Sequence, residues 1–230
     1  MQLDELYCRV RTKGKMWLWL AIDPVTKVLP SLHLGHRKNV DAIPDKAGEA
    51  LALLHDLKLR LHPTSFPAFT TDGLRGYFYA ITAHFGHWFR PKRARTDHWQ
   101  VSDDLLYGQL VKQPKCRKST FTLMRMLCGK RKDMNHLLQQ QGFAPFIQTA
   151  FIERVNLTIR RGVAPLMRKT WSLTQRPEHL LLHLEWWRVY YHFIRTHESL
   201  AVPVPGLRKS RQRSPALAAN LTPKLWSVHS

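Results

Sequence analysis

The sequence predicts an α/β fold in which helices flank a mixed sheet of five strands. Short segments rich in aromatic and aliphatic residues alternate with segments in which apolar residues recur at helical spacing. The resulting order is three strands, a helix, a strand, a helix and a strand, followed by further helices. The 230 residues are 44% hydrophobic and include eight Trp and ten Phe, which is enough for one sizeable core.

The five strands are expected at residues 2–10, 16–22, 28–34, 66–71 and 85–89. The second of them is a nearly continuous apolar run, so we expect both of its faces to be buried. Tight turns, one of them at Asp23-Pro24, join the first three strands, which favours an antiparallel meander. Pro44 opens a helix of recurring leucines that runs up to Pro63, and a second helix covers residues 74–84.

The positive charge is concentrated in the second part of the chain. Residues 1–89 contain 11 Lys/Arg and 8 Asp/Glu, a net charge of +3, whereas residues 90–230 contain 25 and 8, a net charge of +17. This asymmetry indicates a phosphate-rich partner such as nucleic acid, and a ribosomal-type basic protein or a membrane-surface protein is the alternative. Without a run of 18 apolar residues or a signal peptide, and with three scattered cysteines, the chain is expected in a reducing cytoplasm and not in a membrane.

Residues 90–148 are the least regular part, with basic, proline-containing runs at 90–95 and 112–118. Weak helical patterns cover residues 103–111 and 121–141. We expect this part to be a basic, DNA-facing insertion between the fifth strand and the next helix. A solvated linker is the alternative.

Two strong helical patterns follow the irregular part, at residues 149–161 and 177–194, and Gly162 and Pro165 end the first of them. After residue 200 the chain is basic, free of acidic residues and interrupted by Pro, which is poorly suited to a core. We therefore expect residues 1–200 to form the main domain and residues 201–230 a tail that Trp226 pins to it.

The helix around Glu153 combines an apolar stripe with a polar one. Ile152, Val155 and Ile159 share one face, and Glu153, Asn156 and Arg160 share a second face nearby. Glu153 is the only acidic residue between Asp133 and Glu178, among several arginines. It is either an ion-pair partner or a metal ligand beside a polyanion.

Two further acids fall at distinctive places in the expected strands. Asp4 lies within the first strand, and Asp72 ends the fourth, just before Gly73. If those strands are neighbours, the two carboxylates meet, and a helix packed across the sheet could add Glu153. Converging carboxylates in a basic environment suit two Mg²⁺ ions about 4 Å apart, the arrangement used for phosphoryl transfer. Asp23 is the rival for the first position, although an Asp-Pro turn explains it equally well.

Four blocks of this sequence resemble the DDE transposases of bacterial insertion sequences, most closely the insertion sequence 1 family. The blocks are Leu3-Asp4-Glu5-Leu6-Tyr7, Trp17 to Asp23, Thr71-Asp72-Gly73 and Phe151 to Arg160, and the segment Ser214 to Trp226 resembles the ends of such proteins. The resemblance implies an RNase H-like fold. It also implies Mg²⁺-dependent cleavage of DNA at transposon ends, with transfer of the freed 3′ hydroxyl into a target.

The resemblance also implies which residues act. Asp4, Asp72 and Glu153 would be the catalytic residues and would bind two Mg²⁺ ions, for which Mn²⁺ could substitute. The DNA-binding residues would be Asn156, Arg160, Arg154 and Arg161. The partners would be the transposon ends and the target DNA, and the active complex would be a homo-oligomer in a bacterial cytoplasm, associated with the nucleoid.

One departure from the family leaves alternatives open. Relatives carry a zinc finger and a helix-turn-helix before the first catalytic strand, whereas this sequence begins almost at that strand, so the module that reads the ends is expected to be absent or encoded upstream. The alternatives are a catalytically inactive DNA-binding remnant, and an RNase H-like nuclease or resolvase that does not transfer strands.

Overall fold

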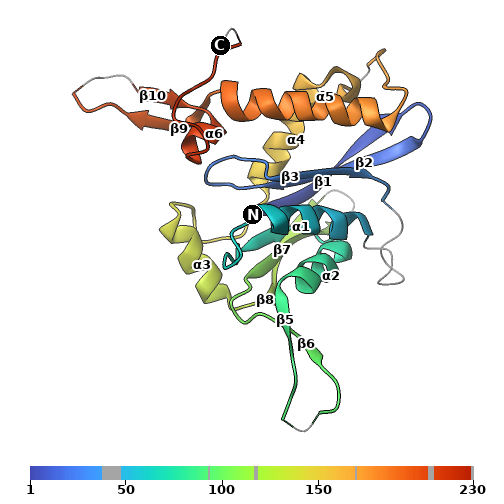
Figure 1. Cartoon of the computed structure of the whole chain (residues 1–230), viewed down its shortest axis with the longest axis vertical. Coiled ribbons are helices and arrows are strands. Elements are labelled where there is room, and N and C mark those ends of the chain that lie inside the picture. Colours follow the sequence, from blue (N-terminus) through green and yellow to red (C-terminus); the bar gives the residue numbers. More distant parts are fainter. Residues whose placement is uncertain (38–47, 93, 117–118, 169, 207–209, 229–230) are drawn as a thin grey trace.

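The computed structural model describes residues 1–37, 48–92, 94–116, 119–168, 170–206 and 210–228. Helices cover both faces of a mixed six-stranded sheet, which confirms the expected α/β class (Figure 1). Among these residues no helix is both long and apolar enough to cross a membrane.

The sheet has the strand order β3-β2-β1-β4-β7-β8. Its strands are β1 (Gln2–Val10), β2 (Gly14–Ile22), β3 (Ser31–Gly35), β4 (Phe69–Thr71), β7 (Tyr107–Cys116) and β8 (Ser119–Cys128). The first three strands form the expected antiparallel meander. Strand β4 then lies parallel to β1 on one side and to β7 on the other, and β8 returns antiparallel to β7. The centre of the sheet is therefore parallel and both its edges are antiparallel.

The expected fifth strand is not in this sheet. Gly86–Phe89 does form a strand, β5, but it pairs with β6 (His98–Val101) in a separate two-stranded hairpin. The place beside β4 belongs to β7, within a segment that we expected to be helical. Polar Gln109 hid this strand from the sequence pattern: it is buried because its amide donates to the Tyr107 hydroxyl, which is hydrogen-bonded to Thr71 of β4.

The helical expectation for residues 121–141 is right only in its second half. Residues 121–128 belong to β8, and α3 (Arg131–Gln140) follows the turn at Gly129. Residues 90–148 are therefore neither a wholly inserted segment nor a linker, because they supply two strands of the main sheet.

Four helices cover the two faces of the sheet. They are α1 (Gly48–Arg60), α2 (Arg75–His84), α4 (Ala150–Gly162) and α5 (Pro177–Val189). Helices α1 and α2 cover one face of the sheet, and α4 and α5 cover the other (Figure 1). Each face has its own buried cluster because side chains alternate along β1: Leu3 packs with α1 and α2, whereas Leu6 and Cys8 pack with α4. The expected start of the first helix at Pro44 lies outside the described residues.

The C-terminal part is folded, contrary to the composition. After the 3-10 turn Ala164–Leu166 and the π-helical turn Tyr190–Ile194 come β9 (His197–Pro203), β10 (Ser210–Arg213) and α6 (Pro215–Ala218). Strands β9 and β10 form a hairpin, so the expected boundary after residue 200 falls inside a strand. Trp226 stacks on Phe193 with ring centroids 4.4 Å apart, and this agrees with the expected pinning of the chain end.

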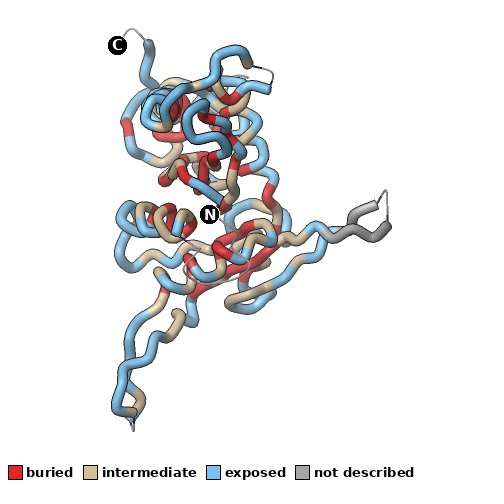
Figure 2. Tube along the Cα trace, turned by 90° about the vertical axis from the view of Figure 1, so that its right-hand side faces the viewer, coloured by how far each residue is buried: buried red, intermediate tan, exposed pale blue. Residues whose placement is uncertain are grey.

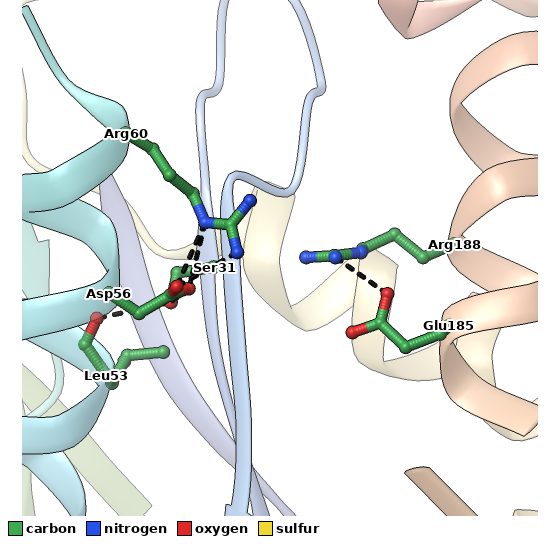
Figure 3. Close-up of polar contacts among 6 residues, drawn as sticks. All are labelled: Ser31, Leu53, Asp56, Arg60, Glu185 and Arg188. Carbon is green, nitrogen blue, oxygen red and sulfur yellow. Dashed lines mark hydrogen bonds and ion pairs between the residues drawn. The ribbon is translucent and has the colours of Figure 1, made fainter. Parts of the chain in front are cut away.

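Charged pairs face each other past the edge strand β3 (Figure 3). On one side Arg60 binds Asp56, whose carboxylate also accepts from the Ser31 hydroxyl at 2.7 Å. On the other side Arg188 of α5 binds Glu185 at 2.6 Å. The two arginines point toward one another. Asp56 also interacts with the charge of Arg188, and Glu185 with that of Arg60. The acids therefore offset the repulsion between the arginines of α1 and α5.

Candidate active site

The parallel pairing of β1 and β4 brings Asp4 and Asp72 together. Gln2 lies opposite Thr70 in this pair, and two residues further along each strand come Asp4 and Asp72. Strand β4 ends at Thr71, and the Asp72 carboxylate then accepts a hydrogen bond from the backbone of Leu74 at 2.9 Å, which holds it in the turn before α2. The expected meeting of these two acids is therefore confirmed.

A third carboxylate in the cluster is one that the sequence did not single out. One oxygen from each of Asp4, Glu5 and Asp72 lies within 4.8 Å of the other two. The Glu5 side chain is only 3% exposed, accepts from the Tyr77 hydroxyl at 3.1 Å and lies 3.4 Å from Arg37. Alternation along the strand places Glu5 on the α2 side of the sheet and Asp4 on the α4 side. The cluster thus lies where the two faces meet at the end of β4.

Helix α4 borders the same site because its apolar stripe packs on the sheet. Ile152, Val155 and Ile159 are buried against the β1–β2 face, as the spacing predicted. Gln2 ties the start of the helix to β1, since its amide donates to the backbone oxygen of Gln148 at 2.8 Å and accepts from the backbone of Ile152 at 3.0 Å. This fixes the polar face of α4 beside Asp4.

Two polar residues of α4 contact the site directly. The Asn156 amide donates to Asp4 at 2.7 Å, and its side-chain oxygen is buried without a partner among the described residues. Glu153 lies one turn earlier, where it accepts from Thr149 at 3.1 Å and pairs with Lys112 of β7 at 3.4 Å. Glu153 is therefore both an ion-pair partner and a border of the site. It remains outside the tight group of Asp4, Glu5 and Asp72.

Burial raises the pKa values of two of the acids, Asp4 and Glu5. The pKa of Asp4 is raised to about 6, mainly by burial and less by the charges of Asp72 and Glu153, while hydrogen bonds to its carboxylate oppose the rise. The pKa of Glu5 is raised to about 7, mainly by burial and less by the charge of Asp72, while the charge of Arg37 opposes the rise. Both groups thus hold protons more readily than isolated carboxylates, and a cation placed among them would relieve their repulsion.

The acids open into a cleft of about 490 Å³. Asp4, Asp72 and Glu153 line it together with three basic side chains, Arg37, Arg75 and Lys112. A mouth in which basic groups surround carboxylates can attract a polyanion while the acids hold a cation. None of these three basic residues was expected at the site, because each comes from a different element and no local pattern connects them.

The chain matches no protein-family model, no curated protein and no solved structure.

The remaining candidates lie away from the cleft. Arg160 lies two turns after Glu153 along α4, near Cys8. Arg154 lies on another side of the helix, near Lys27, and Arg161 is exposed at the helix end. Asp23 caps its own turn by accepting from the backbone of Val25 and Thr26, and it lies beyond the start of β1, because the preceding residue, Ile22, is opposite Gln2. Of the two rivals, only Asp4 lies with Asp72.

Proposed function

We propose that this chain is a DNA transposase of the DDE type with an RNase H-like core. It would cut DNA at the ends of an insertion sequence and join the freed 3′ hydroxyl to a target. The observation that carries the proposal is the meeting of Asp4 on β1 with Asp72, just past the end of the adjacent parallel strand β4, in a cleft that Glu153 of a later helix also lines. The antiparallel meander followed by two parallel strands supports the RNase H-like assignment.

The site fits a divalent cation. Its ligand atoms are carboxylate oxygens, which Mg²⁺ and Mn²⁺ prefer, and the buried amide oxygen of Asn156, which has no hydrogen-bond partner among the described residues, is a further oxygen ligand. Asp4 and Asp72 would hold the metal with Glu5 or Glu153, and two ions would fill the complete site. Bound there, the metal would activate the attacking oxygen and stabilise the leaving one.

The surrounding residues would orient the ligands and the DNA. Asn156 holds one oxygen of Asp4, and Thr149 holds Glu153, so neither carboxylate is free to rotate away from the cleft. Lys112, Arg37 and Arg75 at the mouth would bind backbone phosphates. Arg160, Arg154 and Arg161 would serve DNA that passes along α4 outside the cleft. The proposal includes a homo-oligomer that bridges two ends in a bacterial cytoplasm.

The decisive experiment offers the protein pre-nicked DNA that carries the sequences flanking its reading frame, with Mg²⁺ and a target plasmid. Joined products are the expected result. Cleavage without joining would replace the transposase by an RNase H-like nuclease or resolvase. Salt-sensitive binding alone would identify a catalytically inactive DNA-binding remnant.

Glu153→Gln tests the role of the helix-borne acid. We expect joining to fall by about a hundredfold or more, since even changes to groups that merely support metal ligands reduce activity by roughly 10- to 100-fold. DNA affinity should be unchanged or higher, because one negative charge leaves a basic cleft. Glu178→Gln, which alters an exposed acid at the start of α5, is the matched control. Joining at the wild-type rate by the Glu153 variant would remove this residue from the mechanism.

A further inference from the structure

The β5–β6 hairpin is an arm that stands away from the body of the molecule. It comprises residues 86–101 and projects at the end opposite α5 in both views (Figures 1 and 2). Most of its described residues are exposed, yet the strands are rich in rings: Trp88 is 67% exposed, Phe89 38% and Trp99 37%. Large apolar side chains are rarely left in water in this number on one small element, and such patches mark interaction sites.

The two tryptophans form one rigid unit. Trp88 and Trp99 are cross-strand partners whose rings meet edge to face with centroids 5.4 Å apart. The indole N–H of Trp99 donates to the backbone oxygen of Thr82 in α2 at 2.8 Å, which anchors this ring to the body. A Cβ at Gly86 would lie 2.8 Å from the Trp99 ring, so glycine makes room for it. Trp88 therefore packs against an anchored ring, and most of its own ring is exposed to solvent.

The opposite face of the arm also carries rings. Phe89 lies 6.3 Å from His98 and 6.4 Å from His87, measured between ring centroids. Strand alternation puts these three on the face that Trp88 does not use. A two-stranded hairpin is only marginally stable by itself, and cross-strand ring contacts help to hold it together. That role accounts for paired rings, but it does not require Trp88 to be two-thirds exposed.

The turn of the arm is strongly basic. The sequence from Arg90 to Arg95 contains four basic residues, and the only acid in the arm is Asp97. Asp97 accepts two hydrogen bonds from Arg90, at 2.7 and 3.1 Å. Among the described residues of the turn, Lys92 and Arg95 have no acidic partner within ion-pair distance. Exposed rings beside unpaired cations favour a ligand with both flat apolar surfaces and negative charge.

We propose that the β5–β6 arm binds unpaired DNA, with Trp88 stacking on a base and the basic turn binding the adjoining phosphates. Every base has a flat face that can stack on an indole, and cations track the backbone, so this combination binds single strands with little sequence preference. In a duplex the base faces are already stacked on each other, and only the phosphates would remain for the arm. The inference rests on the proposed function only for the choice of DNA as the nucleic acid, because DNA cleavage and joining expose unpaired ends.

The test uses the full chain and a short labelled oligothymidylate, with binding followed by fluorescence anisotropy. Trp88→Val keeps a strand-forming residue against Trp99 but removes the stacking surface, so we expect affinity to fall roughly tenfold or more. Trp88→Tyr should retain most of the affinity. Trp186→Leu, at a 76% exposed tryptophan on α5, is the matched control and should bind like wild type. A duplex of equal length should bind with little dependence on residue 88.

Equal affinity of wild type and Trp88→Val would overturn the proposal, as would an equal loss in Trp186→Leu. A clear preference for oligouridylate over oligothymidylate would overturn the assignment to DNA. If Trp88→Val unfolds the arm, Trp88→Tyr decides, because loss of binding by a folded, ring-bearing variant contradicts stacking. Failure here is distinct from failure of the proposed chemistry: oligothymidylate binding compares variants of Trp88 without any cleavage or joining, whereas the joining assay compares variants of the acids.

Discussion

Gln2 illustrates how single residues assemble the candidate site. Its side chain is buried and bridges β1 to the start of α4, so Asp4 and Asn156 come within 2.7 Å of each other although 152 positions separate them. The sequence indicated Asp4, Asp72 and Glu153 because an acid within a strand, just after a strand or alone on a helix is a local signal. It did not indicate Glu5, since strand alternation places neighbouring residues on opposite faces.

His192 makes stability depend on pH. Its ring accepts a hydrogen bond from the backbone of Leu29 at 2.9 Å, and burial, with help from the Arg188 charge, lowers its pKa to about 4. The unfolded chain has the ordinary histidine pKa of about 6.5. The contribution of the neutral ring to the free energy of unfolding is therefore fully present above pH 6.5. It declines by roughly 3 kcal/mol as pH falls toward 4, because in this range only the unfolded state binds the proton.

His192→Gln tests this dependence because glutamine keeps an acceptor but does not titrate. We expect the difference in unfolding free energy between wild type and variant to shift in favour of the variant between pH 6.5 and 4. Urea denaturation at several pH values measures the difference, in which contributions from Asp4 and Glu5 cancel. His179→Gln, at an exposed position on α5, serves as the comparison. A difference that stays constant with pH would show that His192 does not titrate in this way.

At the scale of elements, apolar periodicity predicted the meander, the second helix and the Glu153 helix correctly. Strand β7 escaped prediction because Gln109 and Gly108 interrupt its apolar pattern, and the burial of Gln109 depends on a partner two residues away and on a neighbouring strand. Strand β5 was predicted as a strand but was assigned to the wrong sheet, since nothing local distinguishes a sheet strand from a hairpin strand. Partner choice is a tertiary property.

The contact between α4 and α5 depends on one glycine. A Cβ at Gly162 would lie 2.5 Å from the indole nitrogen of Trp187, a buried residue that stacks on Tyr191. We expect Gly162→Ala to destabilise the protein by about 1–3 kcal/mol, as overpacking usually does. Gly48→Ala, at the start of α1, meets no atom within 4 Å and should be neutral or slightly stabilising. Equal urea midpoints for both variants would mean that Trp187 can move away without cost.

At the scale of the molecule, the basic C-terminal part is an integrated part of the fold. The Trp226 ring stacks on Phe193, its indole N–H donates to Thr222 at 3.1 Å, and its backbone N–H donates to the Phe193 oxygen at 3.1 Å. The composition of residues 201–230 suggested a loose tail, because composition does not show which contacts each side chain makes in the folded protein. A few apolar anchors are enough to order a segment when the body offers a complementary surface.

Trp226→Ala should release this segment. We expect limited proteolysis after residue 200 to become severalfold faster, while the sheet remains intact, because an aromatic pair contributes about 0.5–1.5 kcal/mol beyond its buried area. Trp171→Ala removes a fully exposed tryptophan and should leave the cleavage pattern unchanged. If wild type and the Trp226 variant are cut at the same rate, the stacking does not hold the segment.

By itself the sequence determined the α/β class, the antiparallel start of the sheet and the apolar face of the Glu153 helix, and it indicated Asp4 and Asp72 as candidate site residues. These features are local, because periodicity and turn chemistry act over a few residues. Only the tertiary structure decided that β7 lies beside β4, that Glu5 joins the acids and that the aromatic hairpin stands apart. The first two depend on partners distant in the chain, and the hairpin stands apart because β7 takes the place beside β4. Long-range pairing is settled by which surfaces bury one another.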